Sequence, residues 1–315
     1  MSPGLAVVTG VAGFLGSHLA EALIARGHEV VGVDCFTDYY DPALKRTNLA
    51  ALSREPRFRL FELDLAAADL APLPDRPRHV YHLAAQAGVR ASWGREFASY
   101  AHHNVLATQR VLERWRNAGC ERVVVASSSS VYGDAERMPT VETDCPRPYS
   151  PYGVTKLAAE HLALLYARNF GVPAVAMRYF TVYGPRQRPD MGFHRFICAL
   201  LDGSAVTLYG DGEQTRDFTF VADAVAANLA AAERGVPGTV YNVGGGSRVS
   251  VNDVLSRLAR LTGRPLTLDR RPPQPGDPRD TGADIGLAGR DLAWRPQVSL
   301  DEGLARQVAW QRGDT

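Results

Sequence analysis

The chain has little net charge, no long apolar run and no leader-like start, and each shortage excludes a class of protein. Its 315 residues carry a formal net charge of +1, so no overall field favours nucleic acid or an anionic membrane surface. No apolar stretch approaches the roughly 20 residues that a membrane-spanning helix needs. The first residues lack the basic and apolar regions of a secretory signal, so we expect a cytoplasmic protein with no nucleic-acid or membrane partner.

Cysteine is also scarce, and its spacing excludes the usual metal and disulfide frameworks. The four cysteines are Cys35, Cys120, Cys145 and Cys198, and no two of them form a C-x-x-C pair. A metal site would need clustered ligands, and cytosolic proteins seldom keep disulfides. We therefore expect four reduced thiols and no metal site.

What is present is an alternation of apolar runs and helical patterns over the first part of the chain. Such an alternation predicts right-handed strand–helix–strand units, and hence an α/β fold with a doubly wound parallel sheet. The expected strands are 5–9, 29–34, 58–65, 79–85, 122–128 and 174–181. The expected helices include 14–26, 96–118 and 150–170. After residue 181 proline and glycine become frequent, which indicates a smaller, loop-rich region beside the sheet.

Three glycines follow the first expected strand in the pattern G-x-x-G-x-x-G. Gly10, Gly13 and Gly16 permit a tight turn and let the backbone approach a pyrophosphate. The helix that starts there offers free N–H groups and the positive end of its dipole. The glycines could form a simple turn, but their place at the first strand–helix junction favours a dinucleotide site.

Two aspartates follow the next two strands. Asp34 ends the second strand, where a carboxylate accepts hydrogen bonds from both ribose hydroxyls and repels a 2′-phosphate. This position favours NAD over NADP, although a solvated turn residue is the alternative. Asp64, after the third strand, is a candidate acceptor for the adenine amino group.

Tyr152 and Lys156 form a Y-x-x-x-K pattern on an expected helix, and the i,i+4 spacing places both on one face. An ammonium beside a phenol favours the phenolate, and a bound nicotinium adds positive charge, so the tyrosine becomes a useful base. The alternative is a surface tyrosine and a solvated lysine. Catalysis is favoured because Lys45 and Lys156 are the only lysines and the glycine loop supplies a cofactor. The serines at 127–130 offer a hydroxyl to relay the proton, although such a run can also be a plain loop.

These patterns belong to longer segments that resemble extended short-chain dehydrogenases/reductases acting on nucleotide sugars, over nearly the whole chain. The segments are TGVAGFLG (9–16), HLAAQAGVR (82–90), SSSSVYG (127–133), YGVTK (152–156), RYFTVYGPRQRPDM (178–191), YGDGEQTRDFTFVADAV (209–225), YNVGGG (241–246) and PGD (275–277). The resemblance implies a Rossmann-type NAD-binding domain at 1–180, with a segment near 217–245 returning to it. It also implies a nucleotide-sugar-binding α/β region at 181–315.

The resemblance further selects an activity. Ser128 matches the catalytic Ser or Thr of the family, beside Tyr152 and Lys156. Related dehydratases follow that position with Asp-Glu, where this chain has Ser129-Ser130, and related decarboxylases keep a Glu at the position of Ser130. Epimerases need neither. The resemblance thus implies NAD-dependent 4-epimerisation of a UDP-sugar through a transient 4-keto intermediate.

The substrate is expected to be UDP-glucuronate, which would become UDP-galacturonate. The stretch 181–191 looks most like UDP-glucuronate 4-epimerases, in which Thr181 and Arg188 would face the carboxylate, and the segment 32–46 looks like the same branch. A guanidinium suits a carboxylate, although Arg186 and Arg188 could also be solvated loop residues. Three alternatives remain, namely a UDP-glucose/UDP-galactose 4-epimerase, a UDP-glucuronate decarboxylase and a non-catalytic NAD-binding protein.

The resemblance also assigns the remaining contacts. Arg216 would grip the UDP pyrophosphate and Asp277 would lie on the substrate side, whereas Gln274 replaces an arginine that some UDP-galactose 4-epimerases keep. The expected cofactor contacts are Gly10, Gly13, Phe14, Leu15, Gly16, Asp34, Asp64, Leu65, Leu83, Ala84, Ala85, Asn104, Ser127, Tyr152, Lys156 and Tyr179. The expected substrate contacts are Val89, Arg90, Ser128, Ser129, Thr181, Arg188, Leu208, Tyr209, Arg216 and Asp277. The helices at 96–118 and 150–170 would form a homodimer interface.

Overall fold

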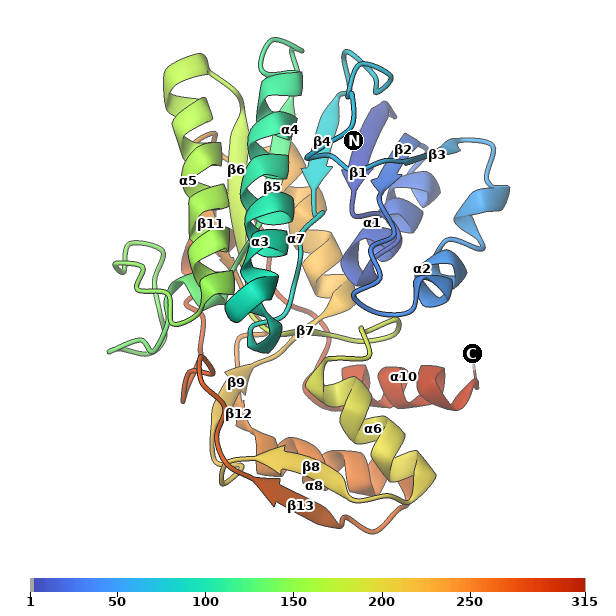
Figure 1. The fold of residues 1–315 in the computed structure, drawn as a ribbon, viewed down its shortest axis with the longest axis vertical. Coiled ribbons are helices and arrows are strands. Elements are labelled where there is room, and N and C mark those ends of the chain that lie inside the picture. Colours follow the sequence, from blue (N-terminus) through green and yellow to red (C-terminus); the bar gives the residue numbers. More distant parts are fainter. Residues whose placement is uncertain (1–2, 315) are drawn as a thin grey trace.

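Seven parallel strands form the central sheet of the computed structural model, which describes residues 3–314 (Figure 1). Their order across the sheet is β11-β6-β5-β4-β1-β2-β3. The strands are β1 (Leu5–Thr9), β2 (Glu29–Asp34), β3 (Phe58–Glu62), β4 (His79–His82), β5 (Arg122–Ser128), β6 (Ala174–Tyr179) and β11 (Val240–Val243). Because the chain moves outward from β1 in both directions, the sheet is doubly wound, and the expected Rossmann-type α/β fold is confirmed.

Helices cover both faces of this sheet, and the alternation along β1 shows how the faces divide. Val8 packs with α1 (Phe14–Ala25) and α7 (Val221–Arg234), whereas Val7 packs with α4 (Ala107–Trp115) and α5 (Pro151–Phe170). Neighbouring residues of a strand point to opposite faces, so a continuous apolar run fits a strand buried on both sides. Full burial of each such valine contributes about 1.5–3 kcal/mol.

The second region lies beyond the carboxyl ends of the central strands, at the bottom of Figure 1. It has its own apolar core, to which α6, α8 and α10 contribute. Its elements are α6 (Gly192–Asp202), β8 (Val206–Tyr209), β9 (Thr215–Asp217), β12 (Arg248–Ser250), α8 (Val251–Thr262), β13 (Leu268–Arg271) and α10 (Leu300–Arg312), and the short pair β7 (Val182–Tyr183) and β10 (Thr219–Phe220) adjoins them. The chain returns to the main sheet through α7 and β11 before it completes this region, and α9 (Gly286–Asp291) packs against β11.

Three expected strands end earlier than the apolar runs suggest. The runs at 58–65, 79–85 and 174–181 leave the sheet after Glu62, His82 and Tyr179. The remaining apolar residues of these runs line a cavity at the edge of the sheet. The apolar runs therefore predict which residues are buried, but they do not predict where the hydrogen bonds between the strands end.

The helix expected at 96–118 is wrong as a single regular helix. After a 3₁₀ turn at Gly94–Glu96, the chain forms α3 (Phe97–Tyr100), a π-helical segment (Ala101–Leu106) and then α4, which ends at Trp115. π-Helical turns commonly occur at functional positions. Here the turn contains Asn104, whose side chain donates to the carbonyl of Gln86 and to Thr155 Oγ1.

The helix expected at 150–170 is confirmed with its boundary residues. Ser150 Oγ accepts a hydrogen bond from the amide of Gly153 at 3.1 Å, and Pro151 opens the first turn. Gly171 ends the helix in the left-handed region with φ +67°. α2 (Pro42–Asn48) begins in the same way, with Asp41 as its cap. Within residues 3–314, the helices are all too short or too polar to cross a membrane.

Candidate active site

A cavity of about 860 Å³ opens between the carboxyl ends of the central strands and the second region. This is the crevice in which doubly wound sheets bind their ligands. All expected site residues except Asp64 and Asn104 line it. The lining residues among them are Gly10, Gly13, Phe14, Leu15, Gly16, Asp34, Leu65, Leu83, Ala84, Ala85, Val89, Arg90, Ser127, Ser128, Ser129, Tyr152, Lys156, Tyr179, Thr181, Arg188, Leu208, Tyr209, Arg216 and Asp277.

The glycine loop has the close backbone packing that a pyrophosphate site requires. A Cβ at Gly16 would lie 2.1 Å from the carbonyl oxygen of Gly10, and one at Gly10 would lie 2.7 Å from the amide nitrogen of Ala84. Gly10 also has φ +68°, a conformation that L side chains rarely adopt. Gly13 precedes α1 without a side-chain cap, and the first turn of α1 carries no acidic residue. Its amide groups therefore fit the anionic phosphates of a dinucleotide.

Asp34 stands at the end of β2 and faces the same cavity. Its two oxygens accept hydrogen bonds from the amides of Ala12 at 3.0 Å and Phe36 at 2.9 Å, which fix the carboxylate in place. Burial raises the pKa of this carboxyl, while these amides and the Lys45 ammonium oppose the rise. A carboxylate oxygen has two lone pairs, so both oxygens retain capacity for the ribose hydroxyls of NAD.

Asp64 and Asn104 lie outside the cavity wall in the structure. Asp64 accepts a hydrogen bond from His102 Nε2 at 2.8 Å. Although burial alone would raise its pKa, the bonds from His102 and from the amide of Ala66 hold it below the usual range. The Asn104 side chain accepts a hydrogen bond from the amide of Gln86 and donates one to its carbonyl, and so it fixes the loop that lines the cavity.

Tyr152 and Lys156 lie one turn apart on α5, next to the end of β5. The Tyr152 side chain is hydrogen-bonded to Ser128, which is itself buried. The Tyr152 ring meets that of Tyr100 edge-on, with the ring centres 6.2 Å apart. The three residues expected to carry out catalysis are thus brought to one wall of the cavity. A hydroxyl hydrogen-bonded to a phenol can pass a proton to it.

The groups around Tyr152 act on its pKa in both directions. Burial raises the pKa of Tyr152, and the Ser128 hydrogen bond and the Arg188 charge act in the opposite direction. Burial also lowers the pKa of Lys156 to about 8, against the attraction of Glu160. The Glu160 carboxylate, one turn further along α5, thus favours the Lys156 ammonium, and the Arg188 charge favours the Tyr152 phenolate.

A buried ion pair, Arg178–Glu160, lies behind the catalytic residues. Glu160 accepts from Arg178 Nη2 at 2.6 Å and Nε at 2.9 Å, and from Ser127 Oγ at 2.6 Å. The Arg178 and Glu160 side chains are only 4% and 1% exposed. The pair joins β5, β6 and α5 directly beneath the catalytic residues.

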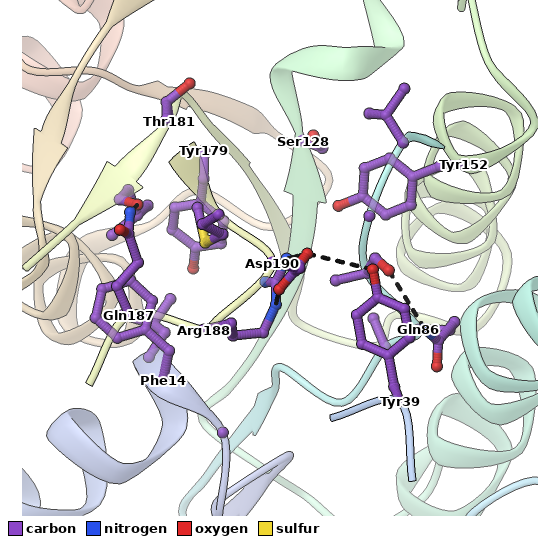
Figure 2. Close-up of a pocket in the computed structure, with 18 of the residues that line it drawn as sticks. Phe14, Tyr39, Gln86, Ser128, Tyr152, Tyr179, Thr181, Gln187, Arg188 and Asp190 are labelled. Atoms are coloured by element: carbon purple, nitrogen blue, oxygen red, sulfur yellow. Dashed lines mark hydrogen bonds and ion pairs between the residues drawn. The ribbon is translucent and has the colours of Figure 1, made fainter. Parts of the chain in front are cut away.

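The structure separates the two loop arginines whose roles the sequence left open. Arg186 turns to α1, where its Nη2 lies 2.7 Å from Glu21 Oε1. Arg188 lines the cavity and donates to Asp190 through both Nε and Nη2, each at 3.0 Å. Tyr39 donates its hydroxyl to the same carboxylate at 3.2 Å (Figure 2). Neither arginine is a solvated loop residue.

The residues expected to lie near the UDP pyrophosphate also line the cavity. Arg90 Nη2 lies 2.8 Å from Asp277 Oδ2, and the Arg90 guanidinium lies 4.3 Å from the centre of the Tyr209 ring. Arg216 donates to the carbonyls of Thr215 and Arg279. Burial lowers the pKa of Arg216, against the attraction of Asp277 and Asp280. Such a guanidinium suits a phosphate.

Sequence reasoning missed three residues that organise the site, namely Asp190, Tyr39 and Glu160. Asp190 lies inside the 178–191 segment and Tyr39 inside 32–46, so both were within segments that carried the family resemblance. Glu160 continues the i,i+4 series of Tyr152 and Lys156 along α5. Of the three residues, only Glu160 has a sequence spacing from which its place at the site could have been predicted.

Known proteins are similar to this chain in both sequence and fold. The profile of the NAD dependent epimerase/dehydratase family matches residues 6–244. The "uncharacterized UDP-glucose epimerase YtcB" of Bacillus subtilis is 44% identical over 308 residues, 96% of each chain. A UDP-glucuronate 4-epimerase of Thermodesulfobacterium geofontis is 36% identical over 98% of this chain and 96% of that one. The Bacillus cereus UDP-glucuronic acid 4-epimerase, crystallised with UDP-glucuronic acid and NAD, superposes with a TM-score of 0.95, at 42% identity over 99% of this chain and 100% of that one.

Proposed function

Because the chain belongs to the NAD-dependent epimerase/dehydratase family and is an NAD-dependent UDP-sugar 4-epimerase, we propose that it converts UDP-glucuronate to UDP-galacturonate. The observation that supports this substrate is Arg188, which lines the cavity and acts electrostatically on Tyr152. The carboxylate of a uronate is attached to C5, next to the carbon whose hydroxyl must meet Tyr152. A guanidinium at that place binds a carboxylate through two parallel hydrogen bonds.

The chain's own residues handle the proton of the reaction. Tyr152 takes the proton of the sugar 4-hydroxyl, and Ser128, hydrogen-bonded to Tyr152, orients that hydroxyl. NAD, when bound, supplies a reversible hydride acceptor for C4. Arg216 keeps the pyrophosphate in place while the 4-keto sugar turns over, and Tyr152 then returns the proton to O4. The acid, the base and the cofactor are all regenerated because no net oxidation occurs.

A uronate adds a hazard that the site must suppress. Its 4-keto form is a β-keto acid, which loses CO₂ when the C5–C6 bond breaks and its electron pair passes to C5 and the ketone. Arg188 opposes this loss because its ion pair stabilises the negative charge on the carboxylate, and that charge moves away to the enolate oxygen when neutral CO₂ forms. Thr181, which also lines the cavity, would hold the carboxylate from a second direction. Ser130 offers no carboxylate to promote the elimination.

The test is product analysis with UDP-glucuronate and UDP-glucose side by side, without added NAD. We expect UDP-galacturonate as the main product and no stoichiometric CO₂ or NADH. Arg188→Ala should lower turnover of UDP-glucuronate about 10- to 100-fold or raise the fraction released as CO₂, with a smaller effect on UDP-glucose. Unchanged kinetics and products in this variant would refute the role of Arg188, and stoichiometric CO₂ from the wild type would identify a decarboxylase.

A UDP-glucose 4-epimerase is the second candidate, and one observation favours it. Asp190 already neutralises Arg188, so a sugar without a carboxylate would not bury an unpaired guanidinium beside it. A wild-type kcat/KM that is higher for UDP-glucose than for UDP-glucuronate would select this candidate.

We also propose that the protein forms a homodimer through α4 and α5. These helices lie side by side on one outer face of the sheet (Figure 1). Their outer surfaces and flanking turns expose large apolar side chains, which include Leu106, Val154, Leu165 and Phe170. Exposed large apolar side chains on neighbouring helices are consistent with a protein–protein interface, and a second copy would bury the same side chains on both subunits.

A further inference from the structure

One edge of Arg188 is already occupied by a carboxylate of the chain itself. Asp190 accepts from Nε and Nη2 of this arginine, which is the side-on bidentate arrangement. A guanidinium carries five N–H donors, so both hydrogens of Nη1 and one of Nη2 remain. These remaining donors form the end-on fork, whose geometry suits a second carboxylate.

Asp190 is in turn fixed from the opposite side of the cavity. Tyr39, from the loop after β2, donates to Asp190 Oδ2, although the two residues lie 151 positions apart in the chain. The Tyr39 hydroxyl packs against Gly88, where a Cβ would approach it to 2.3 Å. The carbonyl of Gly88 accepts the Tyr100 hydroxyl at 2.7 Å, which anchors this contact to α3. The side chain of Asp190 therefore has little freedom to turn away from Arg188.

The pair lies where the sugar must react. Arg188, Asp190 and Tyr152 all line one cavity, and Figure 2 shows the pair beside the Tyr152 ring. In keeping with this position, Arg188 lowers the pKa of the Tyr152 phenol and Asp190 raises it. Asp190 itself remains ionised, because the charge and hydrogen bonds of Arg188 and the hydroxyl of Tyr39 hold its pKa below the usual range against the effect of burial. A guanidinium so placed would lie between the Asp190 carboxylate and the carboxylate of a uronate bound at Tyr152.

We propose that Asp190, with Tyr39, is a positioning residue that presents the free fork of Arg188 to the sugar carboxylate and so sets the preference for a uronate over a neutral hexose. The inference rests on the proposed function, since it concerns how the UDP-glucuronate carboxylate is held. A free arginine side chain loses rotamer entropy on binding, and Asp190 removes that loss in advance.

The arrangement has a consequence that a merely structural residue would not have. Asp190 can face a substrate carboxylate only while Arg188 lies between the two like charges. In Arg188→Ala the carboxylate of Asp190 is left to repel the uronate. The double variant Arg188→Ala/Asp190→Asn removes this repulsion, so it should convert UDP-glucuronate better than Arg188→Ala alone.

The experiment measures kcat, KM and released CO₂ for UDP-glucuronate and UDP-glucose. Asp190→Asn keeps the shape but sets an amide N–H against an arginine N–H, so we expect the uronate-to-glucose ratio of kcat/KM to fall about 10- to 100-fold, mainly through KM. CO₂ release should rise. Tyr39→Phe should lower the same ratio about 2- to 10-fold. The matched control is Asp202→Asn, an exposed aspartate at the end of α6, which should leave the ratio unchanged.

The results distinguish a failure of this inference from a failure of the proposed function. A ratio that is unchanged or raised in both Asp190→Asn and Tyr39→Phe, in a wild type that converts UDP-glucuronate, overturns this inference alone. A double variant no better than Arg188→Ala also overturns it. A wild type that does not convert UDP-glucuronate overturns the proposed function together with the inference. Tyr39→Phe and the double variant keep the test decisive if Asp190→Asn folds poorly.

Discussion

Replacing Glu160 by Gln should destabilise the protein far more than the loss of one exposed ion pair. Gln has the shape of Glu, but its NH₂ group would face an N–H donor of Arg178. The guanidinium, 4% exposed, would keep one hydrogen bond to the remaining amide oxygen, the carbonyl of Glu142 at 3.1 Å and the Tyr132 ring at 4.6 Å, but it would lose its anionic partner. The nearby Lys156 would also lose the carboxylate that favours its charge.

The expected magnitude follows from the burial of the pair. Removing one partner of a buried ion pair typically costs about 3–5 kcal/mol because the other charge remains uncompensated. That is a large part of the roughly 5–15 kcal/mol by which folded proteins are stable. Glu302→Gln is the matched control, since Glu302 and Arg306 form an i,i+4 pair whose side chains are 49% and 52% exposed. Such a pair contributes about 0–1 kcal/mol.

The assay is equilibrium urea unfolding at neutral pH, followed by far-ultraviolet circular dichroism. Glu160→Gln should shift the midpoint strongly to lower urea with an unchanged slope, whereas Glu302→Gln should barely shift it. The double variant Glu160→Gln/Arg178→Met should recover part of the loss, because it removes the orphaned charge. The reasoning is refuted if Glu160→Gln and Glu302→Gln unfold at the same midpoint, or if the double variant is no more stable than Glu160→Gln.

Three further predictions concern the cofactor loop, the buried lysine and the outer helices. Gly16→Ala should abolish NAD binding, measured by calorimetry, because its Cβ meets backbone, whereas the control Gly282→Ala, whose Cβ has its nearest neighbour at 3.6 Å, should bind normally. Lys156→Met should abolish turnover yet stabilise the fold by about 3 kcal/mol at pH 7, since the pKa of Lys156 falls from 10.5 to about 8 on folding. The folded state disfavours the Lys156 ammonium, so the destabilisation of the wild type is complete below about pH 8 and disappears as the pH rises toward 10.5. The difference in unfolding free energy between variant and wild type should therefore shrink between these two pH values. A difference that stays constant would contradict this assignment. Leu165→Glu should convert a dimer to a monomer in light scattering after gel filtration, because Leu165 is 52% exposed on the proposed interface; a dimer that persists unchanged would exclude this face.

The parts of the site that the sequence predicted are those encoded in one contiguous stretch. The glycine loop combines a strand end, a tight turn and a helix start within eight residues, and the Tyr152–Lys156 pair needs only one turn of helix. The strand runs were also sufficient to place Asp34 and Ser128 at the same edge of the sheet, because parallel strands end together. Local patterns and one topological rule thus bring most of the cavity wall together.

The parts that were not predicted depend on contacts between distant segments or on a local irregularity. Tyr39 meets Asp190 only because the loops after β2 and β7 face each other across the cavity. The direction of Asn104 depends on a π-helical turn, which a 3.6-residue apolar pattern does not reveal. Asp64 was placed correctly after β3, but its pairing with His102 follows from the same irregular segment.

Charge pairing in the cavity limits what any single motif can say about the substrate. An isolated buried arginine would demand an anion, and Arg188 without Asp190 would therefore specify a uronate by itself. The observed pair is neutral, and its selectivity must come from the direction of the remaining donors instead of from the net charge. A sequence pattern records that the arginine is present, whereas the edge that it offers to the sugar is decided by two residues from other loops. Substrate choice in this cavity is therefore a property of the Tyr39–Asp190–Arg188 arrangement, and substitutions of Tyr39 or Asp190 should change specificity while Tyr152 and Lys156 stay in place.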